Sequence, residues 1–148
     1  MLLLFIAGST LTPALQPLQF LVGHCWRTTL SEGPTDTHCF VALEGGTQVR
    51  DRHTVRKDGR PIYTGESVFT APAGKMHFIY TGSTGAHIEG PMHVAGDKMV
   101  FDDVDKTGSE TSWRQVDATH YEDVSVAPPA LSHFNQRKLF ELVPDEKP

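Results

Sequence analysis

Acidic and imidazole side chains alternate with basic ones along the segment TQVRDRHTVR, residues 47–56. Successive side chains of a β-strand point to opposite faces, so Asp51 and His53 share a face with Val49 and Val55, while the arginines take the other face. A carboxylate beside an imidazole can orient a polar ligand or transfer a proton. The elements around this segment decide whether that face is an interior one.

The register of the following hairpin decides whether a second carboxylate joins this pair. The stretch KDGR carries an Asp-Gly hairpin signal, because Gly59 tolerates the positive φ of a tight turn. A symmetric two-residue turn places Glu66 opposite Asp51, so we expect Asp51, His53 and Glu66 to face the interior together. Buried there, they must bond one another, water or a ligand. The alternative is a barrel end open to water or a bulge that shifts the register, and the frequency of bulges in barrels favours it.

Two cysteines and several ring side chains flank another hairpin, whose turn lies in SEGPTD, residues 31–36. A symmetric register places Cys25 opposite Cys39, on the face away from the rings. A cross-strand disulfide would use both cysteines and suit an oxidising compartment, although cross-strand Cβ atoms are usually too far apart. Two buried free thiols are the alternative, which this Cβ distance favours, and no Cys-x-x-Cys spacing indicates a redox pair. The opposite face carries four ring side chains: His24, Trp26, His38 and Phe40.

Histidines on neighbouring strands are also candidate metal ligands. His24 and His38, with His53 as a third, are of the type that zinc and iron sites use with a carboxylate. None of them has the local spacing of a metal motif, and eight scattered histidines produce some same-face pairs by chance. We therefore expect no metal and no cofactor.

Composition limits the class of protein. A chain of 148 residues suits one domain and can bury about 68–70% of its unfolded surface. This is enough for a stable core without disulfides or metal ions. The net charge is −5 and no block of basic residues occurs, which argues against a nucleic-acid partner. No apolar run approaches the roughly 20 residues of a membrane span.

Turn signals punctuate the chain and predict an all-β fold. SEGPTD, EGGT, KDGR, APAGK, GSTG, AGDK, KTGS and VDAT separate runs rich in Val, Phe, Tyr, Ile and Thr. Such spacing is typical of consecutive hairpins in a sandwich or barrel, here with about ten strands, the last in RKLFELV. PALQPLQFLVG differs, because Leu15, Leu18 and Leu21 suit a short amphipathic helix that Gly23 stops.

The apolar start of the chain has two interpretations. Residues 1–14 are either the remnant of a signal peptide, cleaved near Ala14, or an apolar arm, and the liability of an exposed arm favours the signal. Residues 15–148 form the predicted barrel domain. A signal would place the protein in the periplasm or outside the cell; without one it is expected in the cytoplasm.

A short helix followed by Gly23, Trp26 and a meander of hairpins resembles the lipocalin-like (calycin) barrels, especially the small bacterial type, and more distantly nitrobindin and the fatty-acid-binding proteins. The resemblance implies a single antiparallel up-and-down barrel, with Trp26 plugging its closed end under an arginine, Arg137 or Arg114. The Gly-to-Trp spacing here is one residue longer than in lipocalins. Haem, bound in nitrobindin-like barrels through a late histidine, is not favoured, since the Gly-rich signature after Trp26 is missing.

These observations favour a binding or carrier protein for a small, partly apolar or amphipathic molecule held in the barrel. The alternatives are a small barrel enzyme of the isomerase or cyclase type, with His53 as base and Asp51 or Glu66 tuning it, and a structural envelope-associated domain without ligand. The binding hypothesis and the enzyme hypothesis rest on the same residues, so the sequence does not separate them. The expected cavity residues are Trp26, His38, Phe40, Asp51, His53, Glu66, Tyr80, Trp113 and Tyr121.

Overall fold

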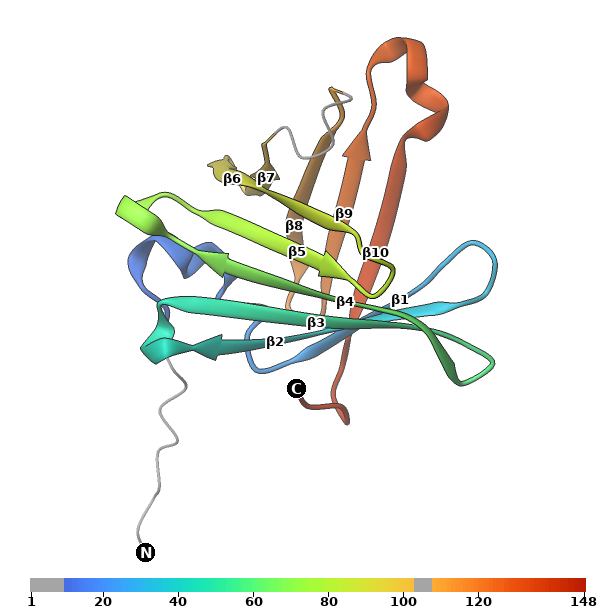
Figure 1. Cartoon of the computed structure of the whole chain (residues 1–148), viewed down its shortest axis with the longest axis horizontal. Coiled ribbons are helices and arrows are strands. Elements are labelled where there is room, and N and C mark those ends of the chain that lie inside the picture. Colours follow the sequence, from blue (N-terminus) through green and yellow to red (C-terminus); the bar gives the residue numbers. More distant parts are fainter. Residues whose placement is uncertain (1–9, 103–107) are drawn as a thin grey trace, which may run out of the picture.

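Ten antiparallel strands close into one barrel in the computed structural model, which describes residues 10–102 and 108–148. Each strand pairs with its neighbours in sequence, and β1 closes the barrel by pairing with β10, as Figure 1 shows. The predicted all-β up-and-down barrel is therefore confirmed. The strands are β1 (Cys25–Thr29), β2 (Thr35–Leu43), β3 (Gln48–Lys57), β4 (Arg60–Thr70), β5 (His77–Gly82), β6 (His87–Ala95), β7 (Lys98–Phe101), β8 (Glu110–Asp117), β9 (His120–Val126) and β10 (Gln136–Val143).

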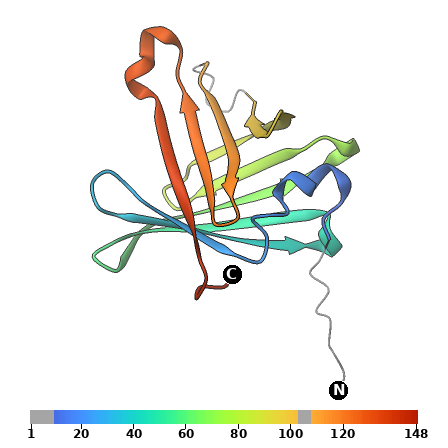
Figure 2. The same ribbon diagram turned by 180° about the vertical axis from the view of Figure 1, so that it is seen from behind.

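Within the described residues the helical segments are four short 3₁₀ turns, η1 (Pro13–Leu18), η2 (Glu44–Gly46), η3 (Pro72–Gly74) and η4 (Pro129–Phe134). The expected amphipathic helix is η1, which Figure 2 shows beside one end of the barrel. Pro17 lies inside it and lacks the N–H that an α-helix would need, so the helix is of the tighter type and ends before Gly23. None of the helices in the described part of the chain is long and apolar enough to cross a membrane.

Apolar side chains fill the barrel end that η1 covers. Leu15, Leu18 and Leu21 are completely buried there, together with Phe40 and Val49 from the barrel wall. Leu11 is also buried, so the core of the barrel begins before residue 15, the start that the sequence analysis gave to the domain. Residues 1–9 of the segment interpreted as a signal remnant or an apolar arm lie outside the described residues.

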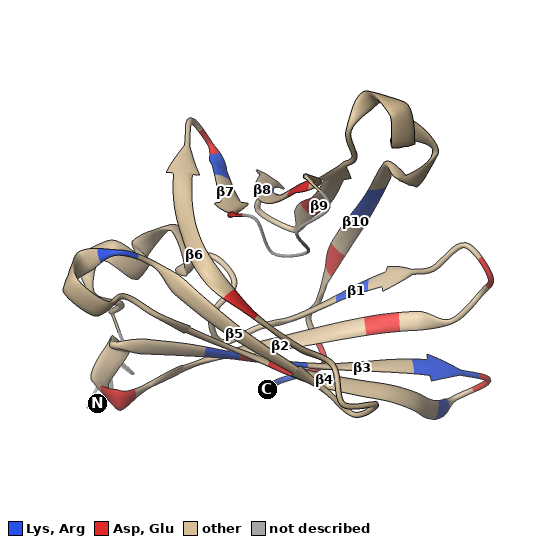
Figure 3. Cartoon of the chain, turned by 45° about the horizontal axis from the view of Figure 1, so that its top comes forward, with Lys and Arg blue, Asp and Glu red and all other residues tan. Residues whose placement is uncertain are grey.

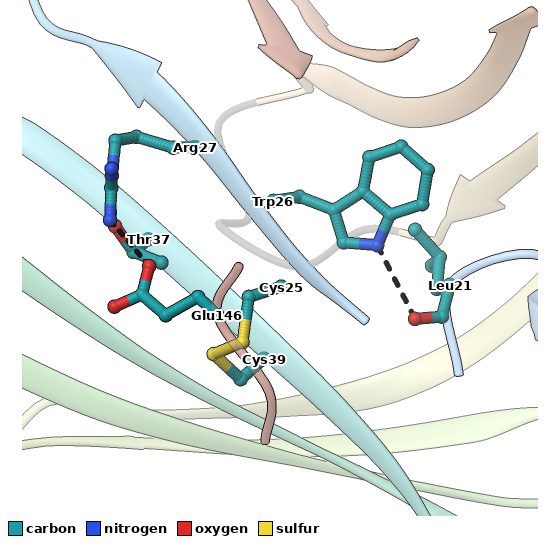
Figure 4. The surroundings of a disulfide bond; sticks show 7 residues. All are labelled: Leu21, Cys25, Trp26, Arg27, Thr37, Cys39 and Glu146. Atoms are coloured by element: carbon teal, nitrogen blue, oxygen red, sulfur yellow. Dashed lines mark hydrogen bonds and ion pairs between the residues drawn. A yellow bond between two sulfur atoms is a disulfide. The ribbon is translucent and has the colours of Figure 1, made fainter. Parts of the chain in front are cut away.

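Trp26 lies in this closed end, as the resemblance implied. Its ring is 1% exposed and meets Phe20 and Tyr121 edge to face. The indole Nε1–H donates to the carbonyl oxygen of Leu21 at 3.3 Å, drawn in Figure 4. This bond ties the segment after η1 to the first strand and makes Trp26 part of the plug.

The arginines expected above Trp26 lie elsewhere. Arg137 Nε donates to Glu122 Oε2 at 2.7 Å, and Arg114 Nε donates to Glu122 Oε1 at 2.8 Å. Glu122 neighbours Tyr121 on β9, so it points to the opposite face from that buried ring. The two arginines therefore bridge three strands from the outside of the barrel rather than covering Trp26.

The first hairpin has the predicted register, with Cys25 opposite Cys39 and Trp26 opposite His38. A disulfide joins Cys25 to Cys39, with the Cα atoms 4.1 Å apart. Figure 4 shows the disulfide on the opposite side of β1 from the Trp26 ring, beside Arg27. Of the alternatives left by the sequence, the structure therefore has the bridge and not two free thiols.

A bulge shifts the register of the β3–β4 hairpin. Lys57 pairs with Arg60 across the expected two-residue turn, but Val55 pairs with Tyr63, leaving Ile62 as an extra residue. Pro61 cannot donate a ladder hydrogen bond, and prolines within sheets concentrate at such bulges. The shift moves every later residue of β4 to the opposite face from the one predicted.

Glu66 is the residue that this bulge displaces, so its predicted place in the cavity is wrong. It pairs with Arg52, and its carboxylate accepts from Arg52 Nε at 2.9 Å on the outside of the barrel. Ser67 takes the predicted position opposite Asp51. Figure 3 shows acidic and basic segments distributed over most strands, and the Arg52–Glu66 pair belongs to this mixed outer surface.

The barrel wall parts between β1 and β10. Cys25 to Arg27 pair with Glu141 to Val143, after which the two strands diverge, as Figures 1 and 2 show. A cleft of about 910 Å³ lies along these diverging strands. Lys138 borders both this cleft and the interior cavity, so the two spaces are neighbours.

Candidate functional site

A cavity of about 370 Å³ occupies the barrel interior beyond the apolar plug. Its size lies within the range of small-molecule sites. Polar and titratable groups from β2, β3, β4 and β5 form one wall. Four aromatic rings from β5 to β10, together with Ile88, Thr111, Asp123 and Lys138, form the other. The lining residues are Asp36, His38, Asp51, His53, Ser67, Phe78, Tyr80, Ile88, Phe101, Thr111, Trp113, Asp123, Lys138 and Phe140.

His38 stands between two carboxylates. Its Nδ1 lies 2.6 Å from Asp51 Oδ2 and its Nε2 lies 3.3 Å from Asp36 Oδ2. Burial disfavours the charged ring, but the charge of Asp51 and the bonds to both carboxylates outweigh it and raise the pKa of His38 to about 10. Burial likewise opposes charge on Asp36, yet its hydrogen bonds to His38 and His53 hold the pKa of that carboxyl well below its usual range.

His53 extends this network toward two tyrosines. Its Nδ1 lies 2.8 Å from Asp36 Oδ1, and its Nε2 lies 3.0 Å from the Tyr80 hydroxyl. The Tyr80 hydroxyl lies 2.7 Å from that of Tyr63. Burial and the bond with Tyr63 raise the pKa of Tyr80, so the Tyr80 hydroxyl stays protonated and can donate or accept.

Gly65 makes the contact between His53 and Tyr80 possible. It lies on β4, between the strands that carry these two side chains, and pairs directly with His53. A Cβ at this position would collide with His53 Nε2 and with the Tyr80 hydroxyl. The bulge and Gly65 together therefore open the space across which the network is formed.

Two buried polar atoms next to the cavity have no hydrogen-bonding partner among the described residues: Asp51 Oδ1 and the Tyr121 hydroxyl. Asp51 is 1% exposed and Tyr121 is completely buried. Burial, followed by the charges of nearby carboxylates, Asp51 first among them, raises the pKa of Tyr121 well above its usual value. An unpaired buried polar atom costs about 1–3 kcal/mol, so both atoms favour a polar group entering from the cavity.

The opposite wall holds one further carboxylate among aromatic rings. Asp123 Oδ2 accepts from Trp113 Nε1 at 3.1 Å, and Asp123 pairs with Lys138 across the neighbouring strand. Burial raises the pKa of Asp123, while Lys138 and the Trp113 bond oppose that shift. Trp113 packs edge to face on Phe101, with ring centroids 4.9 Å apart, and forms the apolar surface of the wall.

The structure places the predicted site residues in four groups. Trp26 and Phe40 belong to the buried plug, and Glu66 lies outside. Tyr121 lies where the plug meets the cavity, with its ring against Trp26 and stacked on Phe140. His24 packs its ring against Trp26, with centroids 6.3 Å apart, so it is not the neighbour of His38 that the sequence left open. Five predicted residues line the cavity: His38, Asp51, His53, Tyr80 and Trp113.

Sequence reasoning missed Asp36, Asp123 and Lys138. Period-two alternation contains the signal, because each lies two residues from a buried or cavity-lining ring: His38, Tyr121 and Phe140. Asp36 was assigned to the turn SEGPTD, whereas β2 already begins at Thr35.

No protein-family model matches this chain, and no curated protein matches it either. The closed ten-stranded antiparallel barrel is compatible with a calycin-like barrel. What this chain has in common with the calycin-like barrels is therefore the architecture of the barrel.

Proposed function

We propose that this protein binds a small amphipathic molecule in the cavity of the barrel. The observation that carries the proposal is the division of the cavity into a polar wall and an aromatic wall, with Asp51 Oδ1 buried and unpartnered among the described residues. Binding sites commonly combine an apolar surface with a few polar groups that fix orientation.

The two walls define the chemistry of the ligand. Phe78, Phe101, Trp113 and Phe140 offer rings to a flat or apolar body. A carboxylate accepts hydrogen bonds, so the polar end of the ligand must carry a donor, such as a hydroxyl or an amine, for Asp51 Oδ1.

Charge narrows the ligand class further. Three carboxylates line the cavity, Asp36, Asp51 and Asp123, against the cationic Lys138 and the histidines. An acidic ligand would meet these carboxylates at short range, where like charges repel strongly. A neutral or cationic molecule with a hydroxyl or amine group is therefore the proposed ligand.

The compartment is proposed from the disulfide. Bridges such as Cys25–Cys39 persist in oxidising surroundings, which supports a periplasmic or secreted protein. A carrier role for a barrel of this architecture agrees with the resemblance to calycins.

The test compares two probes that differ by one hydroxyl, naphthalene and 2-naphthol, with quenching of the combined fluorescence of Trp26 and Trp113 as the readout. We expect 2-naphthol to bind about tenfold more tightly, because its hydroxyl donates to the buried carboxylate. Equal affinities, or no binding of either probe, would contradict the proposal. Native mass spectrometry of freshly purified protein checks for a ligand retained from the cell.

Two variants locate the bound probe. Phe140→Ala removes a ring of the aromatic wall and is expected to weaken both probes. Glu66→Gln is the matched control, because this carboxylate lies outside the barrel on Arg52, and it should leave both affinities unchanged. Loss of binding in the Glu66 variant alone would place the probe on the outer surface.

The hypothesis of an isomerase- or cyclase-type enzyme stays a prediction, and the contacts of its three proposed residues differ from those expected. His53, the proposed base, bonds to Asp36, while Asp51 bonds to His38 and Glu66 lies outside. A ligand-free envelope-associated domain is the outcome that failure of both probes would favour.

A further inference from the structure

Asp36, His38 and His53 form a compact group of metal-ligating side chains in the polar wall. One ligand atom from each lies within 4.8 Å of the other two. Asp36 is common to both contacts, with Oδ1 at 2.8 Å from His53 Nδ1 and Oδ2 at 3.3 Å from His38 Nε2. A zinc ion with ligands at about 2.0–2.2 Å holds neighbouring ligand atoms about 3.2–3.6 Å apart. The separation between Asp36 and His38 already lies in this range, whereas the 2.8 Å between Asp36 and His53 is that of a hydrogen bond and must widen when an ion enters.

The partners behind the two histidines are those of a metal site. Asp51 Oδ2 lies 2.6 Å from His38 Nδ1 and accepts its proton, which leaves Nε2 to face Asp36. The Tyr80 hydroxyl lies 3.0 Å from His53 Nε2, which leaves Nδ1 to face the same carboxylate. Metal-ligating histidines almost always use their second nitrogen in this way, because that bond sets the tautomer and aims the ring.

A second observation points to a cation. Asp51 is 1% exposed, yet its Oδ1 has no hydrogen-bonding partner among the described residues. Asp36, His38 and His53 are also largely buried, with side chains 9%, 13% and 9% exposed. Two carboxylates in such surroundings are stabilised by a nearby positive charge. A protonated His38 between them supplies one in the metal-free protein, and a divalent ion at the three ligand atoms replaces it with a larger one.

We propose that Asp36, His38 and His53 bind a divalent transition-metal ion of the zinc type, with its remaining coordination positions open to the barrel cavity. Two imidazoles and one carboxylate with open positions suit zinc or iron(II), whereas magnesium and calcium prefer all-oxygen sites. This site shares Asp51 and the polar wall of the cavity with the proposed organic ligand, but it does not need that ligand to be present.

Binding requires a defined adjustment of the ligands. The rings of His38 and His53 are stacked with centroids 4.5 Å apart and planes 19° apart, so they must tilt for their lone pairs to converge on one ion. The protons that the two ligating nitrogens share with Asp36 must leave as the metal enters. The Tyr80 hydroxyl can then accept from His53 Nε2–H while donating to Tyr63.

The test titrates metal-free, disulfide-intact full-length protein with Zn²⁺ by calorimetry, and with Co²⁺ by visible absorption. We expect one Zn²⁺ per chain with micromolar or tighter affinity, a Co²⁺ spectrum of mixed nitrogen and oxygen ligands, and no binding of Mg²⁺. Absence of saturable Zn²⁺ binding overturns the proposal. Because neither titration contains an organic ligand, that result leaves the proposed function standing.

Variants assign the ion to these residues. His53→Gln and Asp36→Asn each remove a ligand and are expected to weaken Zn²⁺ at least 100-fold, whereas Asp51→Asn keeps all three ligands and should weaken it about 10- to 100-fold. His93→Gln is the matched control, since its ring also lies 2.6 Å from a carboxylate, that of Asp102, but is half exposed. Unchanged affinity in the ligand variants, or loss of binding in the His93 variant, overturns the assignment. The loss of cobalt absorption in variants that keep the wild-type circular dichroism separates ligand removal from unfolding.

Discussion

The two ends of the barrel interior are built from the same ten strands but differ in composition. At the end covered by η1, leucines and the rings of Trp26 and Phe40 pack without exposed surface. At the other end, buried carboxylates and imidazoles surround a cavity of about 370 Å³. One end satisfies its groups internally, while the other leaves Asp51 Oδ1 and the Tyr121 hydroxyl unpartnered among the described residues.

This difference between the two ends separates the part of the molecule that stabilises the fold from the part proposed to bind a ligand. Close-packed apolar side chains stabilise a fold through burial and dispersion, whereas incompletely paired polar groups cost stability unless something binds them. The plug is therefore expected to hold the fold together, and the cavity end to be tuned for a ligand. Three substitutions test this division, in order of decreasing effect.

Trp26→Ala should have the largest effect on stability. Its ring is 1% exposed and packs against Phe20 and Tyr121, so truncation leaves a void and costs about 3–5 kcal/mol of unfolding free energy in denaturant titration. Trp113→Ala is the comparison, because one side of that indole already borders open space. A larger loss for Trp113 than for Trp26 would reverse the proposed division between the two ends.

Removing the disulfide should have the next largest effect. Replacing Cys25 and Cys39 together by Ser opens a loop with a sequence separation of 14, for which chain entropy predicts a loss of about 3 kcal/mol. Guanidinium unfolding of the variant should match that of the reduced wild-type protein. Probe and metal binding should survive in the folded variant, because the bridge lies on the other face of β1 and β2 from the cavity. Loss of both would show that the bridge also positions the polar wall.

Tyr121→Phe should have the smallest effect and the opposite sign. The substitution removes a buried hydroxyl that has no partner among the described residues, so we expect a gain of about 1 kcal/mol in the ligand-free protein. Thermal unfolding without 2-naphthol measures the gain in stability of the variant. Thermal unfolding with 2-naphthol measures how much the probe stabilises each protein, and the variant should be stabilised less. A variant less stable than the wild type would show that the hydroxyl is satisfied without a ligand.

The local sequence pattern correctly predicted the faces of several strand residues, but it misplaced one residue of the candidate site. Alternation correctly put Asp51 and His53 inside, and turn length correctly paired Cys25 with Cys39. Glu66 was misplaced because one bulge beside Pro61 changes the face of every later residue in β4. A proline two residues after a tight turn was the available signal.

Other members of the site depend on distant strands. Asp36 and His53 are bonded although they lie 17 residues apart, and His53 meets Tyr80 from 27 residues away across Gly65. Such contacts require the four strands β2 to β5 in one particular register, and no spacing in the sequence specifies that register. For the same reason Asp123 and Lys138 could be assigned to a strand but not to a cavity.

The sequence by itself determined an all-β fold of consecutive hairpins, its turns, its first hairpin and the face of β3 that carries chemistry, because periodicity and turn residues act over a few positions. The single barrel was an expectation from the resemblance to calycins. Only the tertiary structure decided that His38, and not His24, joins His53, and that Asp36 lies between them. Closing the barrel brings strands from opposite ends of the chain around one cavity. The physical reason is that register and closure are set by the sum of contacts over all ten strands, a quantity that no single segment contains.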